Sequence, residues 1–132
     1  MSGLVLCRAI IPGQPVPKGR PRVLRNGHTY TPRKTAEAEQ TLRMEIRVQA
    51  GRPLQPSLAA VEIEADFYLR GFPRVDVDNL GKLVMDALNG MAFRDDAQVW
   101  ATRFRKWPGS TVPRTELTVR TFDVMRQIGG GE

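Results

Sequence analysis

Residues 61–90, VEIEADFYLRGFPRVDVDNLGKLVMDALNG, decide the fold, because their hydrophobic period changes from that of a strand to that of a helix. Over Val61–Leu69, apolar residues alternate with polar ones, which is the pattern of a strand buried on one face. After Asp78, a good helix N-cap, apolar residues recur at helical spacing as far as Leu88. Asn89-Gly90 then stops the helix. The stretch therefore predicts a strand, a loop and an amphipathic helix.

The flanking segments complete a small sheet and add a second helix. That helix is predicted to start at Thr31-Pro32, with threonine as N-cap and proline at the first helical position, and to end at Ala50 before Gly51. Each helix has one apolar stripe, so we expect both on one face of a mixed sheet. We predict one α+β domain over residues 1–132, with residues 129–132 as a disordered tail. The remaining predicted strands are Leu4–Ile11, Val99–Trp107 and Thr115–Phe122, the last two joined by a turn at Pro108-Gly109.

The net charge is +6, and the cations are unevenly distributed. Residues 1–60 hold ten Lys or Arg against three acids, whereas residues 61–132 hold ten against eleven. A basic body around local acids is typical of a protein that binds a polyanion and holds a metal. Cys7 and His28 are each alone, which excludes a disulfide framework and His-paired nucleophiles and disfavours zinc. With no leader and no membrane-spanning run, we expect a cytoplasmic protein without a membrane partner.

The basic residues of the amino-terminal half predict contacts with DNA phosphates. The proline-rich segment 12–22 favours an extended backbone on the surface with exposed cations, although a solvated connector is the alternative. Asn26-Gly27 predicts a type I′ hairpin turn. Phe72, in a later loop, is expected to pack into the core, with stacking on a base as the alternative. The residues expected to contact DNA are Lys18, Arg20, Arg22, Arg33, Lys34 and Arg74.

Acidic residues flank the second predicted helix, with Asp76 and Asp78 before it and Asp95-Asp96 after it. A short return from this helix to the next strand would bring the last carboxylates beside the first two. Converging carboxylates raise each other's pKa, and a hard divalent cation with oxygen ligands removes that cost. Lys82 is placed to donate to a phosphate oxygen, or to pair with Asp78 or Asp86. Capping and turn roles for the acids remain the other interpretation.

Several blocks of the sequence resemble the RusA family of Holliday junction resolvases. The blocks are DVDNLGK at 76–82, DALNG at 86–90 and DDAQV at 95–99. PVPKGRPR at 15–22 and YTPRKT at 30–35 are similar to the opening of phage-type members. The resemblance covers most of the chain, and its acid motif fixes both residue type and spacing.

The resemblance implies a RusA-like homodimeric endonuclease, dependent on Mg²⁺ with Mn²⁺ as a substitute, that resolves four-way DNA junctions by paired cuts. The family's metal-binding and catalytic aspartates fall on Asp76, Asp78 and Asp96, and its essential lysine falls on Lys82. Asp96 is favoured over Asp95 as the late ligand. The similarity to phage-type members implies a bacterial cell, with a phage or prophage as one source of the gene.

Two other functions fit parts of the pattern. A metal-dependent phosphatase of the Asp-x-Asp type would use Asp76 and Asp78, but such sites directly follow a buried strand, and Gly71–Arg74 intervene here. A non-catalytic basic DNA-binding module would explain the arginines and leave the aspartates as an electrostatic penalty against phosphate. A calcium-binding EF-hand is excluded because Ala87 occupies the position of the bidentate glutamate.

Overall fold

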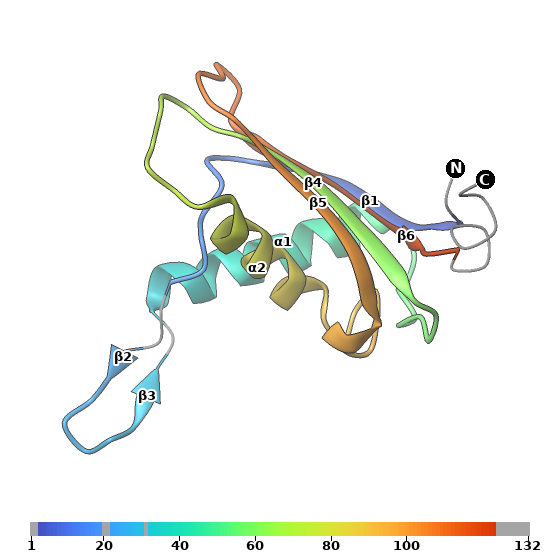
Figure 1. Ribbon diagram of the computed structural model, residues 1–132, viewed down its shortest axis with the longest axis horizontal. Helices are drawn as coiled ribbons and strands as arrows, with labels where there is room; N and C mark the ends of the chain where they lie inside the picture. Colours follow the sequence, from blue (N-terminus) through green and yellow to red (C-terminus); the bar gives the residue numbers. More distant parts are fainter. Residues whose placement is uncertain (1–2, 20–21, 31, 124–132) are drawn as a thin grey trace, which may run out of the picture.

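The computed structural model describes residues 3–19, 22–30 and 32–123, and of Arg22, Thr29 and Tyr30 it describes the backbone. The predicted tail at 129–132 lies outside these residues. The order of strands and helices confirms the predicted order (Figure 1). The elements are β1 (Val5–Pro12), β2 (Arg22–Val23), β3 (Thr29–Tyr30), α1 (Arg33–Ala50), β4 (Val61–Tyr68), α2 (Val77–Leu88), the 3-10 helix η1 (Asp96–Gln98), β5 (Val99–Trp107) and β6 (Arg114–Thr121).

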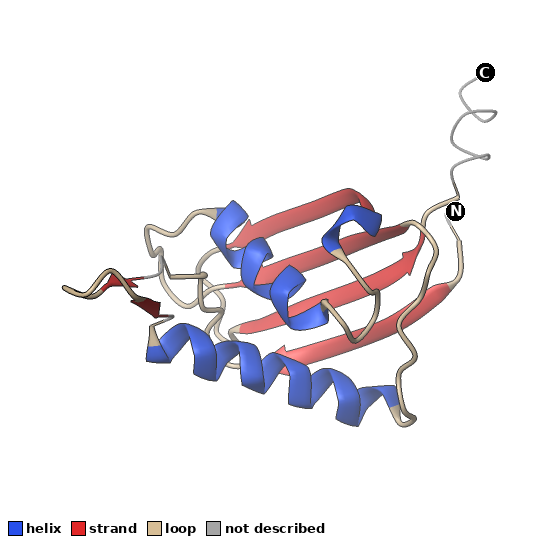
Figure 2. Ribbon diagram, turned by 90° about the horizontal axis from the view of Figure 1, so that it is seen from below, coloured by secondary structure: helices blue, strands red, loops and turns tan. Residues whose placement is uncertain are grey.

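The main sheet has the order β1-β6-β4-β5, in which β4 and β5 are parallel and the other neighbours are antiparallel. It is the predicted mixed sheet. Both helices lie on one face of it, with α1 packed against β1 and α2 packed against β5 and α1 (Figure 2). The helix α2 is the crossover between the parallel strands β4 and β5, so it runs back against their direction.

The core confirms the predicted alternation. In β4, Val61, Ile63, Ala65 and Phe67 are at most 1% exposed, and they face the two helices. In β6 the buried positions are likewise alternate residues, as their hydrophobic pattern predicts. The helix α2 contributes Leu80, Gly81, Leu83, Val84, Ala87 and Leu88 to the buried face. The sheet and the two amphipathic helices therefore share one continuous core.

Gly81 marks a close approach between α2 and β5. A Cβ atom at this position would stand 2.2 Å from the Phe104 ring. Gly81→Ala would gain about 1 kcal/mol of helix propensity but would overpack the contact at a cost of about 1–3 kcal/mol. We expect urea unfolding to show a lower free energy of unfolding for this variant and partial recovery when Phe104→Leu is added. A single variant more stable than the wild type would contradict this packing.

Three predicted details of the helix starts and the hairpin are wrong. The helix α2 begins two residues earlier than predicted, because the Asp76 carbonyl accepts from the Asn79 and Leu80 N–H groups. Asp76 is therefore the N-cap residue, and Asp78 lies in the first turn. In α1, Pro32 is the N-cap position rather than the first helical residue, and Thr31 lies outside the described residues. The hairpin turn is not type I′, since Gly27 has a positive φ of 87° but Asn26 does not.

The proline-rich segment is not a free surface connector as far as the structure describes it. Its backbone is tied to α2 by the Lys18 N–H, which donates to the Asn79 carbonyl at 2.9 Å. It is tied to α1 by the Gly19 N–H, which donates to the Thr35 hydroxyl at 2.9 Å. Val16 packs partly into the core. The described part of the segment, which we call the strap, crosses the starts of both helices, and these contacts position Lys18.

Candidate metal and nucleic-acid site

Asp76 and Asp78 present two exposed carboxylates at the amino-terminal end of α2. Asp76 is the N-cap residue, yet its side chain makes no capping hydrogen bond. Within the described part of the chain, neither carboxylate forms an ion pair. The positive end of the helix dipole favours negative charge at this position. The capping interpretation is therefore wrong for the Asp76 side chain, and its oxygens are available to a ligand.

Asp95 and Asp96 have different roles in η1. The Asp95 side chain accepts a hydrogen bond from the Ala97 N–H at 3.0 Å and forms a capping box with Gln98. The exposed Asp96 accepts from Nδ2 of Asn89, the C-cap residue of α2, at 3.1 Å. Asp95 is thus occupied by local structure, whereas Asp96 is turned toward the carboxy-terminal end of α2. This difference favours Asp96 as the functional residue of the pair.

The predicted convergence of all these acids within one chain is wrong. Asp76 and Asp78 are at the start of α2, and Asp96 contacts the residue that ends it. The 12-residue helix is about 18 Å long at a rise of 1.5 Å per residue. Within residues 3–19, 22–30 and 32–123, no group of three acidic, histidine or cysteine side chains is arranged to hold a metal ion. The crossover helix carries the chain away from the first carboxylates, so the return to β5 begins at its far end (Figure 1).

A second charged group lies at the carboxy-terminal half of α2. Lys18 Nζ is 2.8 Å from the Asp86 carboxylate, and both side chains are partly exposed. The hydrogen bond to Asp86 raises the pKa of Lys18, and the charges of Asp86, Glu39 and Asp96 add to this effect against the opposing effect of burial. Lys18 therefore stands among acids beside α2. Lys82 is exposed, and among the described residues it forms the predicted pair with neither Asp78 nor Asp86.

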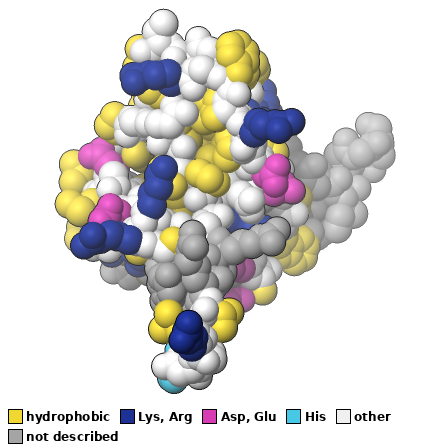
Figure 3. Space-filling view, turned by 90° about the vertical axis from the view of Figure 1, so that its left-hand side faces the viewer, with side chains coloured by type: hydrophobic (Ala, Val, Ile, Leu, Met, Phe, Trp, Pro, Cys, Tyr) yellow, Lys and Arg dark blue, Asp and Glu magenta, His cyan; other side chains and the backbone are white. Residues whose placement is uncertain are grey.

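The residues predicted to contact DNA differ in whether they are exposed and in whether they already form an ion pair. Arg33 is exposed at the start of α1 and pairs with Glu37, with 3.4 Å between Nε and Oε1. Lys34 and Arg74 are exposed. Figure 3 shows Lys and Arg side chains spread over the end of the molecule that carries the hairpin and the starts of both helices. Arg20 and the Arg22 side chain lie outside the described residues, so their predicted roles stay predictions.

The face of the sheet opposite the helices is poorly suited to phosphate, because most of its arginines are paired with acids, although Arg8 is exposed there. Arg105 pairs with Asp66 at 2.8 Å, Arg114 pairs with Glu116 at 2.6 Å, and Arg120 contacts Glu64. Partial burial raises the pKa of Asp66, but hydrogen bonds from Arg105 and Trp107 outweigh burial and hold that pKa below its ordinary value. Among the described residues, the exposed cations without an ion pair that flank the carboxylates, Arg74 and Lys82, lie away from this face.

Two contacts that shape the site were not predicted. The Arg43 guanidinium of α1 donates to the Ala87 and Asn89 carbonyls at 3.1 and 3.3 Å, where it satisfies the end of α2. Lys106 Nζ donates to the Val75 carbonyl at 2.8 Å and steadies the backbone just before Asp76. Both contacts join residues more than thirty positions apart, and the sequence pattern carries no signal for them.

The donor set fits a hard divalent cation by type. Two exposed carboxylates lie within one turn of a helix start, and Asp96 has a fixed partner in Asn89. Mg²⁺ is commonly held by one or two carboxylates together with waters and substrate phosphates, so a closed cage of protein ligands is not required. Cys7 does not offer thiolate chemistry at neutral pH, since burial raises the pKa of its thiol to about 11.

Fold and site together define a class, that of small α+β proteins with exposed carboxylates at a helix start and arginines and lysines nearby. A family model, Endodeoxyribonuclease RusA, matches residues 12–120. The chain belongs to the RusA endodeoxyribonuclease family. Membership implies a metal-dependent nuclease with Holliday junction resolvase activity.

A relative in Bacillus subtilis (strain 168), the uncharacterized protein YqaN, is 31% identical over 130 residues. The match covers 82% of this chain and 91% of that protein. Among the described residues, no helix combines the length and the apolar character needed to span a membrane.

Proposed function

We propose that this protein is a Mg²⁺-dependent endonuclease that resolves four-way DNA junctions by paired phosphodiester hydrolysis. The observation that carries the proposal is the pair of exposed carboxylates of Asp76 and Asp78 at the start of α2, which have no ion-pair partner among the described residues and lie within the residues that the family model matches. Two free carboxylates on a basic protein are unfavourable for a DNA-binding surface unless a cation offsets them. This argues against a non-catalytic binding module.

Each residue has a defined task in the proposed reaction. Asp76, Asp78 and Asp96 would hold a Mg²⁺ ion, which supplies an activated water and offsets charge on the phosphate. Lys82 is exposed one turn after Asp78, and its ammonium group would donate to a non-bridging or leaving oxygen in the transition state. Asn89 would orient the Asp96 carboxylate through its 3.1 Å hydrogen bond.

A second copy of the chain would complete this site. One chain keeps Asp76 and Asp78 about 18 Å from the end of α2, where Asp96 lies. A two-fold axis that crosses α2 near Lys82 would set the start of each α2 beside the end of the other. Asp76 and Asp78 would then face Asp96 of the partner subunit, and the same contact would be made twice. A homodimer would thereby have two equivalent sites, which suits the two scissile strands of a four-way junction.

The test of the function is nicking of a synthetic four-way junction with and without Mg²⁺. We expect cleavage that requires the metal, that EDTA abolishes and that Mn²⁺ restores. Two strands of like polarity should be cut. Linear duplex of the same sequence is the control for structure selectivity. The phosphatase alternative is supported instead if p-nitrophenyl phosphate is hydrolysed while the junction stays intact.

DNA binding should depend mainly on phosphate contacts from the strap and hairpin. Replacing Arg20 and Arg22 together by Ala should weaken junction binding and reduce the slope of log affinity against log salt by about one unit for each phosphate that the variant no longer binds. Fluorescence anisotropy titrations at several salt concentrations measure this slope. A slope equal to that of the wild type would mean that other cations contact the phosphates, with Lys34 and Arg74 as the next candidates.

A further inference from the structure

Phe72 is placed on the surface, against the prediction that it packs into the core. Its side chain is 82% exposed, the largest value among the described large hydrophobic residues. Isolated exposed hydrophobic residues are common and need no explanation. Phe72 differs in the hydrogen bonds that hold its loop, in its charged neighbours and in its short distance along the chain from the carboxylates.

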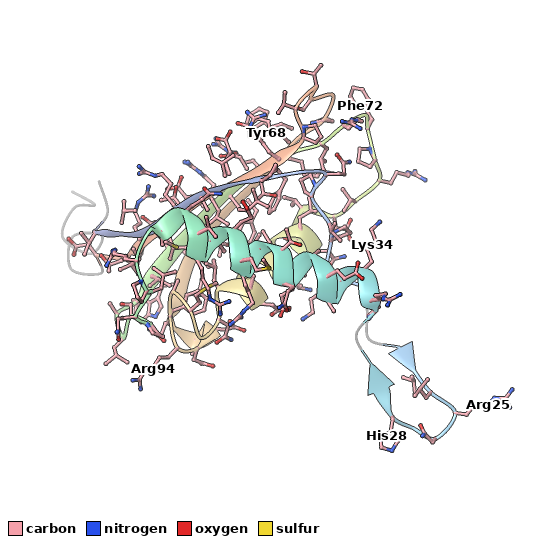
Figure 4. All side chains as sticks on the ribbon, turned by 180° about the vertical axis from the view of Figure 1, so that it is seen from behind. Arg25, His28, Lys34, Tyr68, Phe72 and Arg94 are labelled. Carbon is pink, nitrogen blue, oxygen red and sulfur yellow. The ribbon has the colours of Figure 1, made fainter. Side chains whose placement is uncertain are left out.

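The loop that carries Phe72 is held by two backbone hydrogen bonds just before this residue, and the Lys106 ammonium group contacts the Val75 carbonyl after it. The Gly109 N–H donates to the Gly71 carbonyl at 2.8 Å, and the Ser110 N–H donates to the Leu69 carbonyl at 2.8 Å. The Phe72 ring lies beside Gly109, where a Cβ atom would stand 3.5 Å from Cζ of Phe72. Figure 4 shows Phe72 at the tip of this end of the sheet. Because hydrogen bonds already hold this loop, little conformational entropy is lost when a ligand covers the Phe72 ring.

Phe72 has a cation two positions before it and another two positions after it, and the carboxylates follow a few residues later. Arg70 and Arg74, two positions away on either side, are exposed, and within the described residues their guanidinium groups form no ion pair. Phe72 and Asp76 are four positions apart in the chain, so their Cα atoms are at most about 14 Å apart. A phosphodiester at the carboxylates would thus bring bases a few nucleotides away within reach of the ring.

We propose that Phe72 stacks on an unpaired or end-exposed nucleobase at the branch point, and that it is a specificity-determining residue for branched DNA. The proposal rests on the proposed function and names how that site distinguishes a junction from duplex. In duplex DNA each base is covered on both faces, whereas the centre of a four-way junction exposes base faces. Flat aromatic side chains beside cations stack on bases with little regard to sequence. The flanking arginines favour this polyanion over an apolar protein partner.

The experiment compares junction and duplex binding in Ca²⁺, without cleavage, for the wild type, Phe72→Ala, Phe72→Leu and Phe72→Trp. Stacking is worth about 1–3 kcal/mol per base, so Phe72→Ala should lose about 5- to 150-fold in junction affinity and little in duplex affinity. Phe72→Leu should behave like Ala, and Phe72→Trp like the wild type. A 2-aminopurine at the branch point should show a wild-type fluorescence change that Phe72→Ala removes. Leu58→Ala, which also truncates a highly exposed hydrophobic side chain, is the matched control and should change nothing.

Several results would overturn the proposal. Equal loss of junction and duplex affinity in Phe72→Ala would make Phe72 a general DNA contact, and full recovery by Leu would make it an apolar contact. If light scattering shows that Phe72→Ala changes the protein from dimer to monomer, the ring packs against a second copy of the chain rather than against DNA. Unchanged affinity and 2-aminopurine signal would leave Phe72 without a role. Wild-type junction nicking is measured separately, so loss of the stacking proposal and loss of the nuclease proposal give different outcomes.

Discussion

Asp76→Asn, Asp78→Asn and Asp96→Asn should each reduce junction cleavage about 100-fold or more while junction binding survives or tightens. Asn keeps nearly the same shape but removes a charged metal ligand. Replacing even a residue that only hydrogen-bonds to a metal ligand typically lowers metal affinity or activity about 10- to 100-fold. Binding is spared because each substitution removes a negative charge near the phosphates. The measurements are the nicking rate and the junction affinity, with a thermal melt to check folding.

The structure supplies the controls for this series. Asp95 caps η1, and Asn is about as good a cap, so Asp95→Asn should be much milder than Asp96→Asn. Lys82→Ala should leave metal affinity largely intact and slow the chemical step, as expected of a group that acts in the transition state. If the three Asn variants cleave at the wild-type rate in Mg²⁺, these aspartates do not form the nuclease site.

The fold was largely predictable because one hydrophobic period dominates each element. The alternation over Val61–Leu69 and the helical spacing up to Leu88 each encode a single buried face, and the structure buries those faces. The helix start was missed because two aspartates separated by one residue are almost equivalent capping candidates. Only the backbone hydrogen bonds to the Asp76 carbonyl distinguish them.

The composition of the candidate site was predictable, but its arrangement was not. Spacing placed Asp76, Asp78 and Asp96 around one helix, yet a helix that crosses between parallel strands separates its two ends by its full length. The residue type of Phe72 predicts a place in the core, whereas the structure exposes it on a loop that hydrogen-bonds to the distant loop around Gly109. The Lys18 and Asp86 pair likewise joins residues that only the tertiary fold brings together.

If the site is shared between two copies of the chain, activity should be recovered when two inactive variants are combined. In a mixed dimer of Asp76→Asn and Asp96→Asn chains, one shared site carries both defects and the other carries neither. Random exchange makes about half of the dimers mixed, so about a quarter of the wild-type sites should be restored. Because each mixed dimer has one intact site, it should nick one strand rather than make paired cuts.

The most direct test is therefore to refold the Asp76→Asn and Asp96→Asn chains together, isolate the mixed dimer through two different tags, and measure junction nicking in Mg²⁺. The matched control is a mixed dimer of Asp76→Asn and Asp78→Asn, whose defects lie in the same half of the site and cannot complement. We expect nicking by the first mixed dimer, none by the control and none by either parent alone. A first mixed dimer as inactive as its parents, although it folds and binds the junction, would contradict the shared site.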